Sequence, residues 1–137
     1  MSALITCETC MKDQNAVVTA LKKLGIPGEL ILIAEPGELL QLSGYSRQSA
    51  QVEILIKKSY YRGYGDVGFA KDNKGNYKIY VDDLDDGGAL GAKVGGKFSA
   101  GVSQWYAACV AQKALKKQGL VTKVKKKGNK IVVTASG

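Results

Sequence analysis

The last third of the chain combines a helix pattern with a hairpin pattern, and this pair constrains the fold most. Residues 100–119 are rich in alanine, lack proline and space their large apolar side chains by three or four, which predicts a helix. Residues 120–135 predict two strands joined by a tight turn at Gly128-Asn129. We expect the upstream residues to supply the sheet and the second helix that cover this unit.

The upstream sequence predicts one helix and several antiparallel strands. Asp13 is placed to cap a helix over residues 14–24, and strands are predicted over residues 3–10, 51–56, 66–70 and 77–81. A turn at residues 35–38 predicts a hairpin between strands 30–34 and 39–42. Residues 82–97 are rich in aspartate and glycine and predict a long flexible loop. The result is a single α+β domain over residues 1–137, with one antiparallel or mixed sheet, two helices packed on one face and a C-terminal β-hairpin.

The net charge of +8 is confined to the end of the chain. Acidic and basic residues up to position 112 cancel, and no acidic residue follows Asp86. This concentration predicts a surface that attracts phosphates, an acidic protein or an anionic surface. The alternative is a solvated lysine edge that only prevents strand-to-strand aggregation. The remaining basic residues are Lys113, Lys116, Lys117, Lys123, Lys125, Lys126, Lys127 and Lys130.

The composition argues against catalysis and metal binding. The chain has no histidine, which removes the commonest general base and metal ligand together with Ser-His and Cys-His nucleophiles. Cys7 and Cys10 would point to opposite faces of a strand, so they favour neither a zinc site nor a redox pair. A carboxylate-only or lysine-based enzyme stays open as an alternative, but the clustered acids lie in a glycine-rich loop that would not hold a reacting geometry. We therefore expect a non-catalytic protein with free thiols, no cofactor and no bound metal.

Two further motifs resemble nucleotide or metal loops, but each lacks a required residue. Residues 91–97 have the spacing of a phosphate-binding loop, yet Phe98 stands where a magnesium-binding Ser or Thr is needed. The aspartate run lacks the alternating spacing of a calcium loop, so a solvated turn is predicted. That turn offers a self-association surface made of Asp82, Asp83, Asp85 and Asp86.

Residues 62–69 match the consensus of RNA-recognition domains at all but one position. The consensus stacks bases on aromatic residues at its third and fifth positions. Tyr64 supplies the first, but Asp66 replaces the second with a charge that repels phosphate. We therefore predict a stacking patch and no RNA-recognition domain, with core and edge aromatics as the alternative. The patch comprises Tyr60, Tyr61, Arg62 and Tyr64.

Several short segments resemble the hypothetical plastid reading-frame family numbered thirty-five. They are the opening strand, Lys12-Asp13, the helix end at 20–25, the strand at 66–69, and Tyr106-Ala107 followed by residues 117–119. That family occurs in algal plastids and cyanobacteria and is a domain of unknown function. The resemblance implies a small α+β protein without an established activity, cofactor or catalytic residue. Relatives encoded near a AAA-type ATPase imply an adaptor role, while residues 82–96 and the basic hairpin depart from the family and predict a divergent member.

Together these features predict a small basic protein that holds a polyanion, above all nucleic acid, on its C-terminal lysines. The alternative is a structural, assembly or adaptor protein. Its hairpin would dock on the aspartate loop of another copy or on an acidic partner such as a AAA-type ATPase. Lacking an export leader and an apolar span, the protein is expected to be soluble and intracellular, without membrane insertion. The cytoplasm, the plastid stroma and a viral or phage source are all left open.

Overall fold

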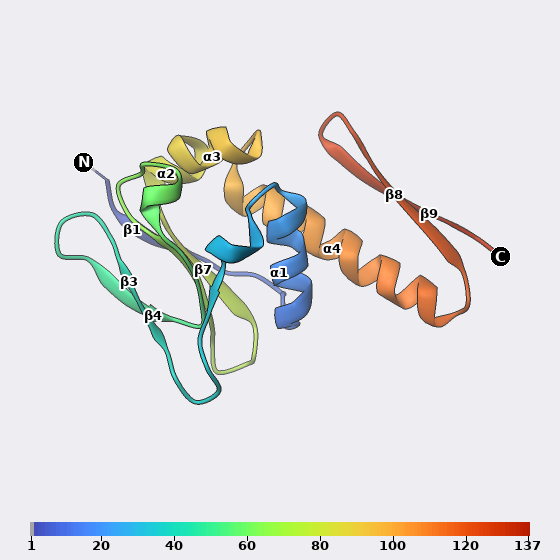
Figure 1. Cartoon of the computed structure of the whole chain (residues 1–137), viewed down its shortest axis with the longest axis horizontal. Coiled ribbons are helices and arrows are strands. Elements are labelled where there is room, and N and C mark those ends of the chain that lie inside the picture. Colours follow the sequence, from blue (N-terminus) through green and yellow to red (C-terminus); the bar gives the residue numbers. More distant parts are fainter. Residues whose placement is uncertain (1) are drawn as a thin grey trace.

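The computed structural model describes residues 2–137 and shows an α+β fold around a five-stranded antiparallel sheet (Figure 1). The strands lie in the order β1-β7-β6-β5-β2, and every neighbouring pair is antiparallel. The predicted fold class is therefore confirmed. The bounds are Leu4–Cys7 (β1), Leu32–Ile33 (β2), Ile54–Ile56 (β5), Val67–Lys71 (β6) and Tyr77–Asp82 (β7).

Two of the helices were predicted from their sequence pattern. Helix α1 begins after Asp13, whose carboxylate accepts hydrogen bonds from the backbone N–H groups of Asn15 and Ala16, as a helix cap should. Helix α4 ends before Gly119, which has a φ of 81°. None of the helices within residues 2–137 combines the length and apolar character needed to cross a membrane. The helices are Gln14–Lys23 (α1), Asp83–Gly87 (α2), Ala89–Val94 (α3) and Phe98–Lys117 (α4), with short 3₁₀ turns at Gly28–Leu30 (η1) and Lys58–Tyr60 (η2).

The main core lies between the sheet and the helices. Alternate residues of β6 and β7 point to this side, where Phe69 and Ile79 meet Leu21 of α1. The first turns of α4 complete the layer, because Phe98 packs against Phe69 with ring centroids 6.3 Å apart. The predicted placement of helices on one face of the sheet thus holds for α1 and the beginning of α4.

A separate hairpin covers the opposite face of the sheet. It consists of β3 (Leu40–Ser43) and β4 (Ser49–Val52), and Leu42 and Val52 bury against Leu55 of the main sheet. The predicted hairpin between residues 30–34 and 39–42 is therefore wrong, because β2 pairs with β5 while β3 pairs with β4. The turn at residues 35–38 does form, but it carries the chain from one layer to the other.

Residues 82–97 form two short helices, so the predicted flexible loop is also wrong. Asp82 caps α2 by accepting a hydrogen bond from the Leu84 N–H at 2.9 Å. Gly91 of α3 lies so close to neighbouring backbone that a Cβ there would sit 2.8 Å from the carbonyl oxygens of Asp86 and Gly96. Glycine therefore permits close packing here, whereas its abundance had indicated flexibility.

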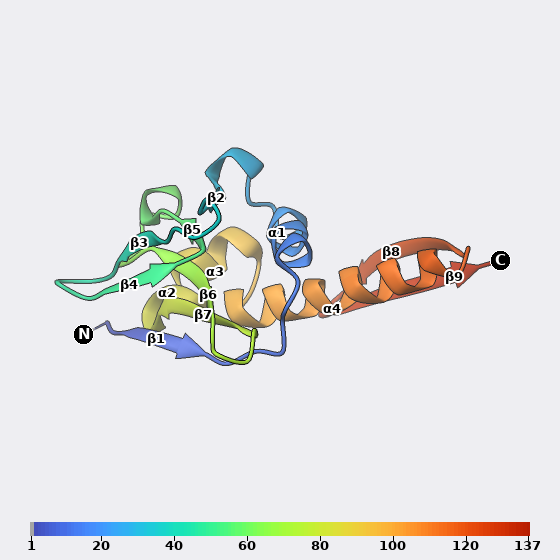
Figure 2. The same cartoon turned by 90° about the horizontal axis from the view of Figure 1, so that it is seen from below.

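The end of the chain extends away from the sheet, and we refer to residues 103–137 as the arm (Figure 2). It contains the rest of α4 and the hairpin of β8 (Val121–Lys127) and β9 (Lys130–Ser136), which confirms the predicted C-terminal hairpin. The hairpin folds back along α4, where the Gln104 side chain donates to the Asn129 carbonyl at 3.1 Å. Ala108 is the sole buried residue in the arm, at 6% exposed. We call residues 2–102 the body.

Candidate functional site

The strand register places four of the predicted lysines on one face of the hairpin. Gln112 of α4 donates a hydrogen bond to the Thr122 hydroxyl at 2.8 Å, so the face of β8 that carries Thr122 lies against α4. Side chains alternate along a strand, and the odd-numbered residues of β8 therefore point outward. Lys130 shares this outer face because it pairs directly with Lys127. The basic outer face consists of Lys123, Lys125, Lys127 and Lys130, whereas Lys126 lies on the other face near the tip.

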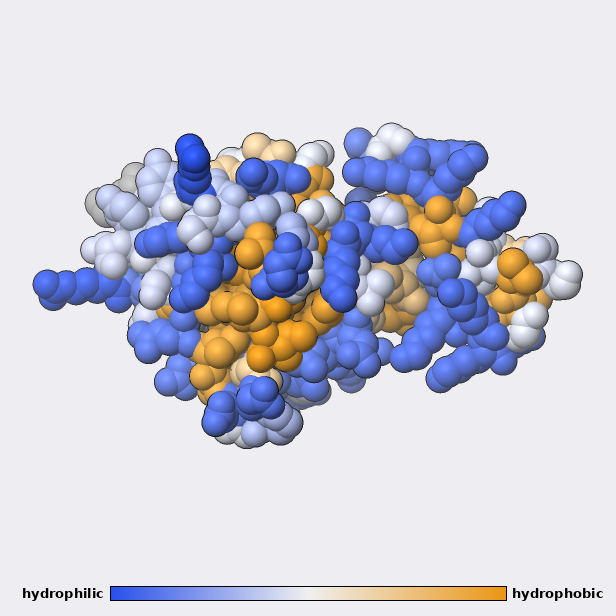
Figure 3. All heavy atoms as spheres, in the orientation of Figure 1, coloured by the Kyte–Doolittle hydropathy of each residue, from blue (hydrophilic) through white to orange (hydrophobic). Residues whose placement is uncertain are grey.

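The outer face is hollowed and lined by basic and apolar groups. A depression of about 470 Å³ lies along it, with Val132 and Thr134 of β9 beside the lysines of β8. Successive lysines on one face of a strand have Cα atoms roughly 6.8 Å apart. Hydrophilic side chains gather over and around the hairpin in Figure 3, with small apolar areas between them. This arrangement presents a regular row of cations whose stems cover apolar surface.

Within residues 2–137, no acidic side chain pairs with the lysines of the basic outer face. Among residues 2–137, the lysines that form ion pairs are Lys57, Lys78, Lys97 and Lys113, none of which belongs to the hairpin. Like charges crowded on one small face repel one another, and an anion that binds across them removes that repulsion. A ligand that carries several negative charges would therefore be attracted to the outer face and would relieve the repulsion between its lysines.

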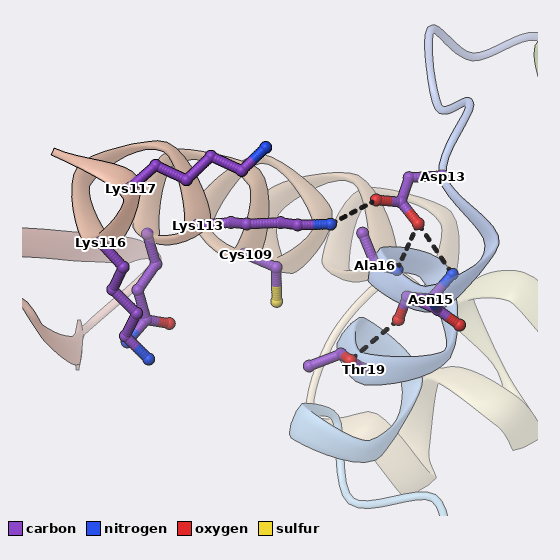
Figure 4. Close-up of a pocket in the computed structure, with 9 residues that line it drawn as sticks. Asp13, Asn15, Ala16, Thr19, Cys109, Lys113, Lys116 and Lys117 are labelled. Carbon is purple, nitrogen blue, oxygen red and sulfur yellow. Dashed lines mark hydrogen bonds and ion pairs between the residues drawn. The ribbon is translucent and has the colours of Figure 1, made fainter.

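The three lysines of α4 form a second group at a pocket between α1 and α4 (Figure 4). The pocket measures about 420 Å³, with Cys109 and Ala16 among its walls. Lys113 Nζ lies 3.4 Å from a carboxylate oxygen of Asp13, so this lysine is already paired. Lys116 and Lys117 line the same pocket. The eight predicted lysines therefore fall into two groups at different pockets, with Lys126 on the other face of the hairpin.

Two titratable groups of this pocket show how it is stabilised. Burial alone would raise the pKa of Asp13, but hydrogen bonds from the Ala16 N–H and from Lys113 outweigh it and lower that pKa. Burial raises the pKa of the Cys109 thiol, while Lys23 opposes this shift. The cysteine is therefore held as a neutral thiol, which is not the reactive form.

The predicted stacking patch does not form as a unit. Tyr61 is only 4% exposed and its hydroxyl donates to the Gly65 carbonyl; burial, reinforced by Asp85, raises its pKa. Tyr60 is half-buried, with Lys93 Nζ lying 5.2 Å from its ring centroid. These two rings belong to the core and its edge, which corrects the prediction. Arg62 and Tyr64 remain exposed.

Sequence reasoning missed the partner of Tyr64. Tyr45, in the turn between β3 and β4, lies edge-to-face against Tyr64 with ring centroids 5.5 Å apart. The two residues are 19 positions apart, and the pairing of β3 with β4 places Tyr45 in a turn that hydrogen bonds between Ser43 and Asp66 hold beside the Tyr64 loop. An aromatic residue inside a polar turn was the single local signal available.

The aspartates of residues 82–86 are mostly buried, so the predicted self-association surface is wrong. Asp82, Asp85 and Asp86 are each 1–2% exposed, and Asp83 alone is exposed. Asp86 accepts hydrogen bonds from both the N–H and the hydroxyl of Ser99 at 2.7 Å. Burial raises the pKa of Asp85, although hydrogen bonds from the backbone of Tyr64 and Gly65 oppose that shift. These carboxylates hold backbone segments together inside the body.

Fold and surface together define a class: small α+β proteins in which a basic hairpin extends from a body with a buried core. A family model described as "Protein of unknown function (DUF1257)" matches residues 20–133, and the chain belongs to that family. No curated protein and no solved structure matches the chain. The predicted membership of a family of unknown function is confirmed, whereas the plastid reading-frame number stays a prediction. The matched range includes all eight C-terminal lysines.

Proposed function

We propose that this protein is a non-catalytic nucleic-acid-binding protein that holds the phosphate backbone on the basic outer face of its hairpin. One observation carries the proposal: Lys123, Lys125, Lys127 and Lys130 share a face that no acidic side chain neutralises within residues 2–137. Lysine contacts with phosphates supply most of the affinity in binding that is independent of base sequence.

The shape of the hairpin also suits this ligand. A two-stranded β-ribbon is narrow enough to enter the major groove of a duplex or to lie along a single strand. The outer face contains no aromatic side chain, so it offers no platform for stacked bases. We therefore expect the hairpin to contact the backbone with little preference for base sequence.

The first experiment measures binding of labelled single-stranded and duplex DNA by fluorescence anisotropy over a range of salt concentrations. The variant K123Q/K125Q/K127Q should bind both probes at least about tenfold more weakly, and the slope of log affinity against log salt should fall by up to about 2.7 on a duplex. The matched control K22Q/K58Q/K74Q removes the same charge from exposed lysines of the body. Equal losses in the two variants would show that only net charge matters and would overturn the proposal.

Assembly through the same lysines is the second candidate, and the separation of charge between body and arm favours it. All acidic residues lie in the body and eight lysines lie in the arm. An adaptor would dock this arm on an acidic surface, either of another copy or of a partner such as a AAA-type ATPase. Light scattering on nucleic-acid-free protein separates the two readings. A salt-sensitive oligomer that ignores both DNA probes would contradict nucleic-acid binding and support assembly.

A further inference from the structure

We propose a second nucleic-acid site, specific for unpaired bases, at the end of the body farthest from the hairpin. It is formed by Tyr45, Arg47, Arg62 and Tyr64, which occupy the β3–β4 turn and the loop before β6. Figure 1 shows the β3–β4 turn and the C-terminal hairpin at opposite ends of the long axis. The inference rests on the proposed function for the class of ligand, but it requires no residue of the arm.

The two tyrosines provide a stacking surface. Tyr45 is 41% and Tyr64 49% exposed, so nearly half of the surface of each residue is accessible to solvent. The two ring planes are 84° apart, so the edge of one ring packs against a face of the other. An unpaired base can stack on such an exposed ring, and every base offers a π-face for that contact. A base inside a duplex is already stacked and has no free face to offer.

Both arginines of the chain lie in these same two loops. Arg47 follows Tyr45 by two residues, and Arg62 precedes Tyr64 by two residues. Each arginine is exposed, and neither forms an ion pair within the described part of the chain. The planar guanidinium can stack on a base or donate two parallel hydrogen bonds to a phosphate from its rigid fork, whereas an ammonium group has neither the plane nor the fork. The arm contains only lysines, so the two ends of the molecule carry different chemistry.

Buried carboxylates hold the two loops together. Asp66 accepts hydrogen bonds from the N–H groups of Ser43 and Lys58 at 3.0 and 2.9 Å, joining the end of β3 to η2. Asp85 accepts from the N–H groups of Tyr64 and Gly65. Asp66 is 2% exposed and hydrogen-bonded to backbone, so it builds this site and is out of contact with a ligand, whereas its place in the sequence motif had indicated an exposed charge. The stacking surface is therefore pre-organised.

The backbone conformation of the two loops is also constrained by close packing. A Cβ on Gly65 would lie 2.9 Å from the Gly44 Cα, so the two loops touch at the level of their backbones. Ser46 and Arg62 are the two non-glycine residues with positive φ within residues 2–137, at 61° and 54°. Such conformations are uncommon, persist where the surroundings hold them, and concentrate at functional sites. Here Ser46 lies between Tyr45 and Arg47, and Arg62 is itself a residue of the proposed site.

The test compares three labelled probes of equal length: an oligothymidylate, an abasic strand and a duplex. The variant Y45A/Y64A should bind the oligothymidylate about tenfold more weakly, because stacking on each ring is lost, and should bind the abasic strand and the duplex as the wild type does. The matched variant Y45F/Y64F keeps both rings and should bind all three probes normally. R62K should also weaken binding of the oligothymidylate, since lysine keeps the charge but loses the planar group.

The outcomes separate this inference from the proposed function. If Y45A/Y64A binds the oligothymidylate normally, or weakens equally on the abasic strand, the stacking site is overturned. Loss of binding to every probe in K123Q/K125Q/K127Q alone would then leave the hairpin function standing. If the tyrosine variant fails selectively while the hairpin variant binds normally, the stacking site stands and the hairpin function is overturned. A wild-type protein that binds none of the probes would overturn both.

Discussion

The body and the arm handle charge and apolar surface in opposite ways. In the body, both faces of the main sheet are covered, and buried carboxylates accept hydrogen bonds from distant backbone N–H groups. In the arm, a single alanine is buried and the hairpin is covered on one face only. Of the lysines of the arm, Lys113 alone forms an ion pair with a residue that the structure describes. Stability is therefore concentrated in the body, while the net charge is concentrated in the arm.

This difference determines which substitutions each region can tolerate without unfolding. The buried carboxylates of the body contribute to the stability of the fold, because a buried carboxylate without its hydrogen-bond donors would cost several kcal/mol. A lysine on the hairpin is solvated and contributes almost nothing to the fold, so its position is constrained mainly by what it contacts. The arm is accordingly the place where binding can be altered without unfolding the protein.

The largest effect should come from the centre of the body. Phe69 is fully buried and packs against Phe98, so F69A should lower the free energy of unfolding by about 3–5 kcal/mol. Urea denaturation followed by circular dichroism measures this change. A loss below about 1 kcal/mol would show that the core between sheet and helices does not dominate stability.

A buried carboxylate of the body should have the next largest effect. D86A removes the acceptor of two hydrogen bonds from Ser99 at the start of α4, and should cost about 2–3 kcal/mol. Its matched control is D83A in the same short helix, which removes an exposed carboxylate that accepts one hydrogen bond from the Ala3 N–H, and it should cost less than about 1 kcal/mol. Similar losses in both variants would contradict the structural role assigned to burial.

The segment around these aspartates shows where sequence reasoning reached its limit. Helices α1 and α4, the β6–β7 pair and the C-terminal hairpin were predictable, because their caps, turns and apolar spacing are local signals. The two short helices of residues 82–97 were not predictable. Four aspartates among glycines are typical of a solvated loop, and the backbone N–H groups that bind Asp85 and Asp86 lie elsewhere in the sequence. For Asp85 those groups lie about 20 residues away, in the Tyr64 loop.

The candidate site was predictable to a similar degree. The sequence predicted the concentration of lysines, but their division between the two faces of the hairpin depends on the strand register. The separate position of the α4 lysines depends on how α4 packs against α1. Tyr60 and Tyr61 were misassigned because an exposed and a buried tyrosine look alike in sequence. Tyr45 was missed because it meets Tyr64 only through the unpredicted β3–β4 hairpin.

A third prediction compares local stability in the two regions. Val133 of β9 is half-buried, and V133A should lower the opening free energy of β8–β9 amides by about 1 kcal/mol. Amides of β6–β7 should be unaffected, because the arm can open without the body. Native-state hydrogen exchange measures both regions in one experiment. An equal decrease in β6 and β7 would show that body and arm unfold as one unit.

The smallest effect concerns the ion pair that joins the two regions, Asp13 of α1 with Lys113 of the arm. Asparagine caps a helix as well as aspartate does, so D13N removes only the charge and should cost about 0.5 kcal/mol at neutral pH. Because the folded-state pKa of Asp13 is lowered, its contribution is present above the ordinary value of 3.8 and is lost as the pH falls through the folded pKa. The difference between D13N and the wild type in urea titrations should therefore vanish in acid.

The double-mutant cycle with K113Q tests whether this pair is the cause. K113Q should cost as much as D13N at neutral pH, and adding it to D13N should cost little more, since either change alone removes the attraction. High salt should shrink the effect, because both side chains are partly exposed to solvent. Additive losses would instead assign the stabilisation to Asp13 acting on the first turn of α1, and body and arm would then be joined by packing without an electrostatic contribution.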